Sequence, residues 1–156
     1  MPYYAVIGSQ STVSSSYKTA AQANATGTNK RGKVFEIILG ANANPNATDT
    51  YLEWQLSRIT ATGAGAYTTF TPNSLDPADG ASVNAAGVNA TAEATTQTSN
   101  SGLFYEGINQ RSAVRWVASQ ESQYLVWPAT SGNGVVLRVQ SGTYTSSVTG
   151  TLSFME

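Results

Sequence analysis

The segment VTGTLSF, residues 148–154, decides the fold class of this chain of 156 residues. Its large apolar residues Val148, Leu152 and Phe154 lie at every second position together with Gly150, and residues with hydroxyl side chains stand between them. In an extended chain, successive side chains point to opposite faces, so this pattern gives one apolar face and one polar face. We therefore expect a half-buried β-strand whose apolar face lies in the core of the protein.

Two further segments predict strands with different surroundings. Residues Thr50–Ile59 place Leu52, Trp54 and Leu56 on one face and mostly polar residues on the other, which again indicates one buried face. Residues Lys33–Leu39 carry apolar side chains on both faces. A strand of that kind is covered on both sides, and we expect the cover to be another sheet or a neighbouring subunit.

Alternation with a period of two recurs along the whole chain, and helical periodicity is almost absent. Further strands are expected at Tyr3–Ile7, Tyr17–Ala25, Ala66–Thr71, Ala92–Gln97, Leu103–Ile108, Ala113–Ala118, Tyr124–Trp127 and Val135–Val139. Short strands at this spacing predict an all-β sandwich or barrel of about 8 to 10 antiparallel strands. The length fits a single domain that spans residues 1–156.

The segment 75–80 is the one place where we expect a short helical turn. Asp76 can cap such a turn with Pro77 at its first position, and a glycine ends it. Asp76 and Asp79 could instead hold a calcium ion, but capping explains the same residues without a metal. The next segment, Ala81–Asn100, is poor in large apolar residues and predicts either a weakly packed edge strand or a long crossover loop.

The chain contains no histidine and no cysteine, which limits its chemistry. A serine or threonine nucleophile usually needs a histidine as its base, and most transition-metal sites need histidine or cysteine ligands. A pair of carboxylates could still act as in glycosidases, but no spacing singles out two of the nine acidic residues. We therefore predict that the protein is not an enzyme and that it uses no cofactor and no metal.

The chain has few charged residues, and its positive and negative charges nearly balance. The formal net charge is −1, and 11% of the residues are charged, against about 25% in an ordinary soluble domain. A protein that binds nucleic acid normally shows a basic stripe, so no nucleic-acid partner is expected. No apolar stretch approaches the length of a membrane span and no signal peptide is evident, so we expect no membrane partner and synthesis in a cytoplasm. Few charges favour association with other protein surfaces.

Two groups of basic residues are candidate contact residues. Lys30, Arg31 and Lys33 form a basic cluster just before the most apolar strand; they either dock on an acidic partner or form a solvated turn that keeps the strand from pairing outward. Arg111 and Arg115 belong to the second group. On a strand, Arg115 shares a face with small and apolar residues, so its side chain covers apolar surface, pairs with a carboxylate or lies in an interface.

The three tryptophans, Trp54, Trp116 and Trp127, allow two interpretations. Each falls at an alternating position compatible with the core, and core packing is the favoured interpretation. The alternative is a platform on which sugars stack. It would require aromatic residues such as Trp127, Tyr105 or Tyr124 to be exposed in a row.

The order of several segments resembles a family of small structural proteins encoded by tailed bacteriophages. The segments that carry the resemblance are residues 4–6, 30–37, 54–61, 71–79, 109–111, 115–118 and 125–130, and they follow one another in order along most of the chain. None of them is a catalytic signature. The resemblance implies a virion component of the head decoration or cement protein type, with a jelly-roll-like β-sandwich.

What the resemblance implies about partners is specific. Such a protein is made in the bacterial host cytoplasm, associates as a homotrimer, and sits on the capsid exterior, where it binds the major capsid protein and stabilises the shell. Lys30, Arg31, Lys33, Arg111 and Arg115 are then the candidate capsid or subunit contacts. Two alternatives stay open: a carbohydrate-binding module on the virion surface, and a tail or connector subunit, which would form rings rather than trimers.

Overall fold

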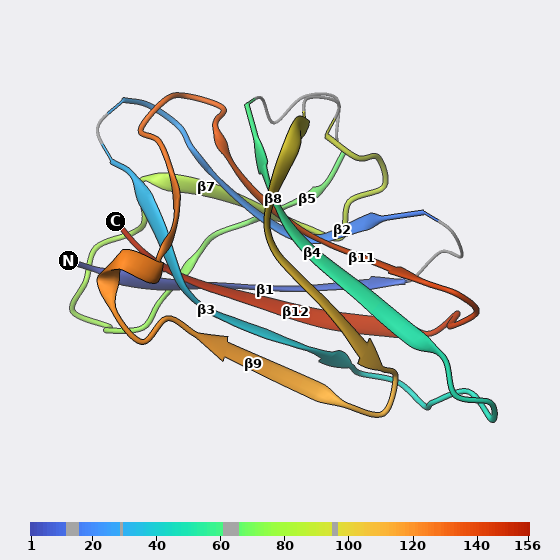
Figure 1. Ribbon diagram of the computed structural model, residues 1–156. Coiled ribbons are helices and arrows are strands. Elements are labelled where there is room, and N and C mark those ends of the chain that lie inside the picture. Colours follow the sequence, from blue (N-terminus) through green and yellow to red (C-terminus); the bar gives the residue numbers. More distant parts are fainter. Residues whose placement is uncertain (12–15, 29, 61–65, 95–96) are drawn as a thin grey trace.

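The computed structural model describes residues 1–11, 16–28, 30–60, 66–94 and 97–156. These residues form twelve β-strands and one short 3-10 helix (Figure 1). The elements are β1 (Tyr3–Ser11), β2 (Lys18–Ala25), β3 (Gly32–Ala41), β4 (Tyr51–Ile59), β5 (Thr68–Phe70), β6 (Asn73–Ser74), β7 (Asn84–Val88), β8 (Gln97–Asn109), β9 (Ala113–Val117), η1 (Glu121–Gln123), β10 (Leu125–Trp127), β11 (Gly134–Ser141) and β12 (Ser147–Met155).

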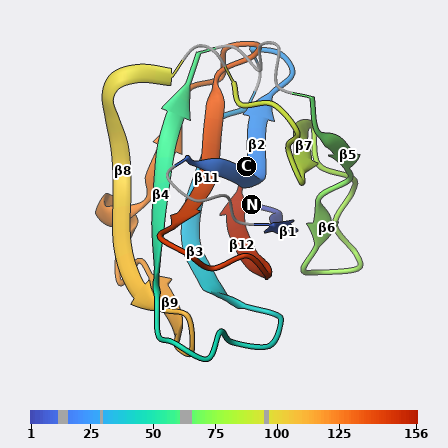
Figure 2. The same cartoon turned by 90° about the vertical axis from the view of Figure 1, so that its right-hand side faces the viewer.

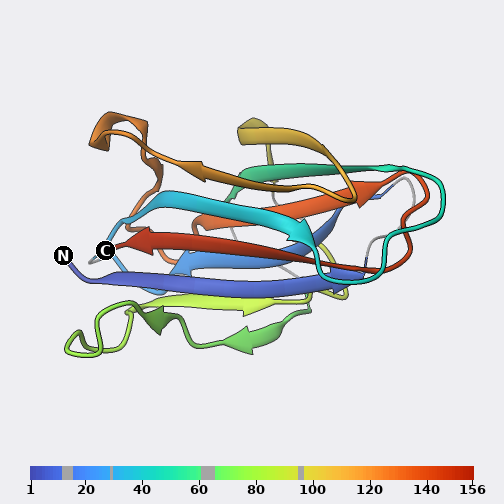
Figure 3. The same cartoon turned by 90° about the horizontal axis from the view of Figure 1, so that it is seen from below.

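The strands form two antiparallel sheets that pack face to face. In one sheet, β3 pairs with β9, β10 and β12, and β12 is followed by β1 and β6. Figure 3 shows β9, β3, β12 and β1 side by side in this order. The second sheet has the order β5, β7, β2, β11, β4, β8, which Figure 2 displays across its width. The predicted all-β sandwich is thus confirmed.

The eight principal strands pair as the two arms of one long hairpin. Strand β1 pairs with β12, β2 with β11, β3 with β9, and β4 with β8. Folding this double-stranded ribbon over places alternate pairs in opposite sheets, which is the jelly-roll arrangement of eight strands. The jelly-roll-like sandwich that the resemblance implied is therefore the observed fold, with the four short strands added to it.

The residues between β4 and β8 widen the sandwich at one edge. Strand β6 extends one sheet beyond β1, and β7 and β5 extend the other beyond β2 (Figure 2). The segment Ala81–Asn100 is therefore neither an edge strand nor a crossover loop throughout, because β7 lies inside its sheet between β2 and β5. The small residues of β7 make this possible, since the ring of Tyr67 covers Gly87, where a Cβ would lie 2.2 Å from the ring.

The strand predicted at Ala92–Gln97 is wrong over residues 92–94, and residues 95–96 lie outside the described ranges. Asn89, with a φ of 53°, turns the chain after β7. Glu93 then accepts hydrogen bonds from the backbone N–H and the hydroxyl of Thr19, at 2.7 and 2.6 Å. These bonds hold the segment as a loop, and β8 begins only at Gln97.

The segment 75–80 is a single hydrogen-bonded turn and not a helix. The backbone N–H of Ala78 donates to Asp76 Oδ1 at 2.9 Å, and the N–H of Asp79 donates to the carbonyl of Asp76 at 3.0 Å. The expected capping by Asp76 is confirmed, and its carboxylate is used inside the turn. The one helical element of the described residues lies elsewhere, at η1, where the sequence predicted none.

The core lies between the sheets and is filled by the alternating apolar residues. Val148, Leu152 and Phe154 of β12 are fully buried, as the sequence predicted. Trp54 and Trp127 are fully buried as well, and the ring centres of Trp127 and Phe154 are 5.3 Å apart. The favoured core placement is thus confirmed for both tryptophans, while Trp116 is partly buried against the same core.

A β-bulge explains why β3 carries apolar residues on both faces. The register between β12 and β3 shifts between Ser153 and Phe154, so that one residue of β3 is skipped. Val34 and Ile37, three positions apart, therefore both point into the core. Ile38 points outward and is 38% exposed, so within the described ranges no second sheet covers the outer face of β3 at this position.

The two chain ends lie side by side at one end of the sandwich (Figure 1). The backbone N–H of Glu156 donates to the carbonyl of Pro2 at 3.3 Å. Within the described ranges, no helix has the length and apolar character that a bilayer crossing requires.

Candidate functional site

Apolar side chains are exposed on the outer face of the sheet that contains β9, β3, β12 and β1. We call this the apolar face; its large exposed side chains are Tyr3, Ile7, Ile38 and Val117, which are 42%, 48%, 38% and 47% exposed. The strand register joins them, because Ile7 lies opposite Thr151 of β12, which lies opposite Ile38 of β3. The row of Ile7, Thr151 and Ile38 therefore crosses three strands and meets Arg115 on β9.

The ion pair between Arg115 and Glu36 also lies on the apolar face. Arg115 lies opposite Ile38 in the strand register, and its Nε donates to Glu36 Oε1 at 2.6 Å. The hydroxyl of Ser153 donates to the other oxygen of Glu36 at 2.9 Å. Of the three arrangements open for Arg115, the structure shows pairing with a carboxylate, so Glu36 balances the charge of Arg115.

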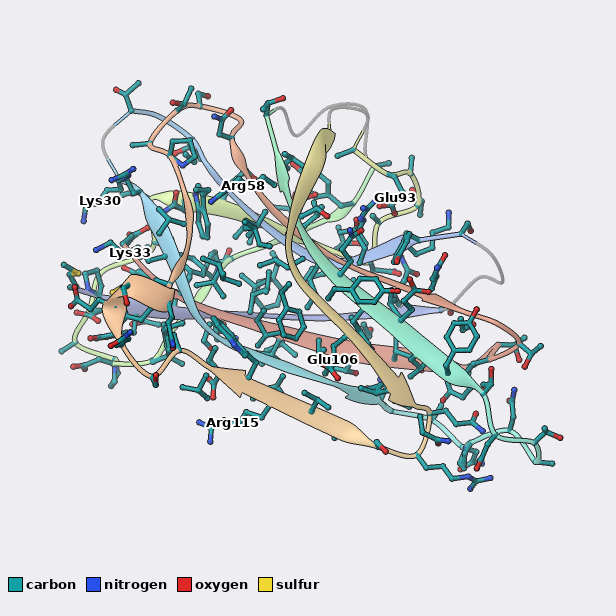
Figure 4. All side chains as sticks on the ribbon, in the orientation of Figure 1. Lys30, Lys33, Arg58, Glu93, Glu106 and Arg115 are labelled. Atoms are coloured by element: carbon teal, nitrogen blue, oxygen red, sulfur yellow. The ribbon has the colours of Figure 1, made fainter. Side chains whose placement is uncertain are left out.

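The five basic residues predicted as contacts do not form one cluster. Lys30 and Arg31 are exposed in the loop before β3, and Lys33 is partly buried at the start of that strand. Figure 4 shows Lys30 and Lys33 near each other and Arg115 apart from them on β9. Arg111 lies in the turn after β8, where its Nε donates to Asp49 Oδ1 at 2.6 Å. Because β3 pairs on both sides, the basic cluster does not protect a free strand edge.

The outer face of the second sheet carries a hydrogen-bonded network around Glu53. Glu53 Oε1 accepts from the hydroxyl of Tyr17 at 2.6 Å and also from the hydroxyl of Tyr105. Glu53 Oε2 accepts from the side-chain amide of Gln140 at 2.6 Å. Both carboxylate oxygens are therefore occupied. The guanidinium of Arg138 lies over the ring of Tyr17, 4.9 Å from the ring centre.

Next to this network lies a shallow depression of about 550 Å³. Tyr51 and Tyr105 stand at its sides and are 53% and 60% exposed. Gly107, which lies opposite Glu53 in the strand register, forms part of the lining, and nothing lies within 4 Å of the place where its Cβ would stand. The missing side chain of Gly107 leaves room between the two tyrosines.

The titratable groups of the depression are poorly suited to general acid catalysis. Hydrogen bonds from the hydroxyls of Tyr105 and Tyr17 lower the pKa of Glu53, and the hydrogen bond from Arg111 lowers the pKa of Asp49. The pKa of Tyr105 is raised by its hydrogen bond to Glu53, and burial together with the same carboxylate raises the pKa of Tyr17. A glycosidase needs one carboxyl group with a raised pKa, and these two are shifted the other way.

The sequence indicated Tyr105 as a possible contact for sugars, but not its neighbours around Glu53. The signal was present in Thr50–Ile59, because the same alternation that buries Leu52 and Trp54 puts Tyr51 and Glu53 on the outer face. Of the other aromatic residues proposed for a sugar platform, Trp127 is buried and the row that included it does not form.

Comparisons of the chain with models of protein families, with curated proteins and with solved structures found no match. The function is therefore inferred from the residues and their geometry.

Proposed function

We propose that this chain is a head decoration protein of a tailed bacteriophage, which binds the major capsid protein on the capsid exterior and stabilises the shell. The observation that carries the proposal is the apolar face, with Ile7, Ile38 and Val117 exposed on one rigid sheet. Exposed apolar patches on soluble domains mark contact surfaces. The jelly-roll sandwich, the low charge and the order of the segments that resemble phage structural proteins support the same conclusion.

The apolar face would stabilise the shell by being buried against the capsid subunits. A decoration protein bridges neighbouring capsid subunits and adds buried area across joints that the packaged genome pulls apart. The apolar face supplies this area, and the pair of Arg115 and Glu36 supplies one polar contact within it. A capsid presents many equivalent sites, so moderate affinity for each copy is sufficient, and association into a trimer strengthens the binding further.

Strand β8 supports self-association into the proposed homotrimer. It is thirteen residues long and, within the described ranges, pairs only with β4, so it forms an edge of its sheet. Edge strands offer unpaired backbone groups to another chain. At the opposite edge of the sandwich the outermost strands are β5 and β6, with three and two residues. The long open edge therefore favours contact between copies on the β8 side.

The substitution Ile7→Glu tests the role of the apolar face. It places a charge on the proposed interface without touching the core, so the variant is expected to fold normally and to lose binding to heads that lack the chain. Binding is measured by co-sedimentation with expanded heads of the phage whose genome encodes the chain, and shell stability by heating the loaded heads. The matched control is Leu75→Glu, an equally exposed apolar residue in the turn after β6.

Two outcomes would contradict the proposal. Heads that are stable to heat without the wild-type chain, and no more stable with it, would exclude the stabilising role. A ring of many copies in native mass measurement would also contradict the proposal. Such a ring is expected of a connector subunit, whereas a decoration protein is expected to give a trimer.

A further inference from the structure

We propose that the depression between Tyr51 and Tyr105 binds a neutral oligosaccharide. This second site lies on the outer face of β4 and β8, in the opposite sheet from the apolar face, and it does not depend on the decoration role. A decoration protein bound through the apolar face would present this depression to the medium.

The shape of the depression fits a flat and extended ligand. Tyr51 lies opposite Asn109, and Tyr105 lies opposite Gln55, so the two tyrosines are four residues apart along the paired strands. That separation is about 13 Å along the strand direction. Gly107 lies between them and leaves open space, which gives a groove with an aromatic ring near each end.

Both rings are held in place by their neighbours. The hydroxyl of Tyr105 donates to Glu53, which fixes the tilt of its ring. The ring of Tyr51 rests against Gly142, since a Cβ on that glycine would lie 3.1 Å from the ring. Rings that are fixed before binding lose little conformational entropy when a ligand arrives, which favours binding by a shallow site.

The chemistry of the lining favours a sugar over a charged ligand. Sugar rings place their C–H groups on exposed aromatic faces, and their hydroxyls bond to side-chain amides such as that of Asn109. An anion would meet the carboxylates of Glu53 and Asp49. A cation would find Asp49 already paired with Arg111 and Glu53 already accepting three hydrogen bonds.

The test uses the whole chain on a glycan array, followed by calorimetric titration with the oligosaccharide that gives the strongest signal. Gly107→Val is the informative variant, because it fills the groove at a position where an added Cβ has no other atom within 4 Å and where a β-branched residue suits the strand. We expect Gly107→Val and Tyr105→Ala each to weaken binding by roughly tenfold or more. Gly80→Val and Tyr3→Ala, which change an open glycine and an exposed tyrosine elsewhere, are the matched controls and are expected to bind as the wild type does.

Three results would overturn the inference: an array without any bound glycan, equal affinity of Gly107→Val and the wild type, or binding of choline chloride in place of sugars. Head binding distinguishes this proposal from the decoration role. Gly107→Val is expected to bind heads normally, whether or not the sugar site exists.

Discussion

At the scale of single residues, close packing leaves some positions with one possible side chain. Gly32 of β3 pairs with Trp127 of β10, and a Cβ on Gly32 would lie 1.8 Å from the indole ring. Gly32→Ala therefore forces the ring or the strand to move, and we expect the free energy of unfolding to fall by about 1–3 kcal/mol or more. Chemical denaturation measures this change. Gly80→Ala is the control, since open space surrounds that glycine, and equal losses for the two variants would contradict the prediction.

The carboxylate of Glu53 makes stability depend on pH at the acidic end. Its pKa is lowered in the folded chain, so its hydrogen bonds stabilise the fold above the ordinary value of 4.5 and lose their effect as the pH falls through the lowered pKa. Glu53→Gln removes this titration, and we expect its unfolding free energy to fall less steeply below pH 4.5 than that of the wild type.

The pKa of Tyr17 is raised above 10.0, so at the alkaline end its contribution is complete below pH 10 and is lost as the pH rises through the raised value. Chemical denaturation at a series of pH values measures the free energy of unfolding at the acidic and the alkaline end. If that free energy fell equally steeply in acid for the wild type and for Glu53→Gln, the role given to Glu53 would be wrong.

At the scale of elements, one side chain ties the last strand to the inserted strands. The carboxylate of Glu156, next to the end of β12, accepts hydrogen bonds from the backbone N–H of Val83 at 3.0 Å, the hydroxyl of Ser82 at 3.0 Å and the amide of Asn84 at 2.5 Å. Glu156→Ala leaves these donors without their partner, and we expect a loss of about 1–3 kcal/mol. Limited proteolysis should then cut between β6 and β7 faster than in the wild type. Unchanged cleavage there would show that the clamp does not hold the insertion.

At the scale of the whole molecule, the two outer faces of the sandwich carry different surfaces. One face exposes Ile7, Ile38 and Val117, and the other exposes the tyrosines around Glu53. Because the core separates them, changes on one face should leave the other intact. Ile7→Glu is expected to lose head binding and keep sugar binding, and Gly107→Val to do the reverse. If either variant lost both activities, the two surfaces would not be independent.

The sequence predicted the fold best where large apolar residues alternate. Residues 148–154 and Thr50–Ile59 became β12 and β4 with the expected faces buried. Prediction failed in Ala81–Asn100, because β7 is built from small residues whose strand character depends on pairing with β2 and β5. Small side chains give little periodic signal, so only the neighbouring strands decide such a segment.

The candidate sites depended more strongly on tertiary structure. Arg115 was singled out from its position on a strand, but its partner Glu36 is 79 residues away in sequence. The tyrosine network joins Tyr17, Glu53, Tyr105 and Gln140 from four separate segments.

The sequence by itself determined the fold class, the identity of most strands and the burial of two of the tryptophans, because alternation and side-chain size act locally along the chain. Only the tertiary structure decided which strands are neighbours, where a bulge turns both Val34 and Ile37 inward, and which exposed side chains gather on one face. The physical reason is that antiparallel pairing brings together residues from distant parts of the chain. Their register depends on the packing of the whole core and not on any one segment.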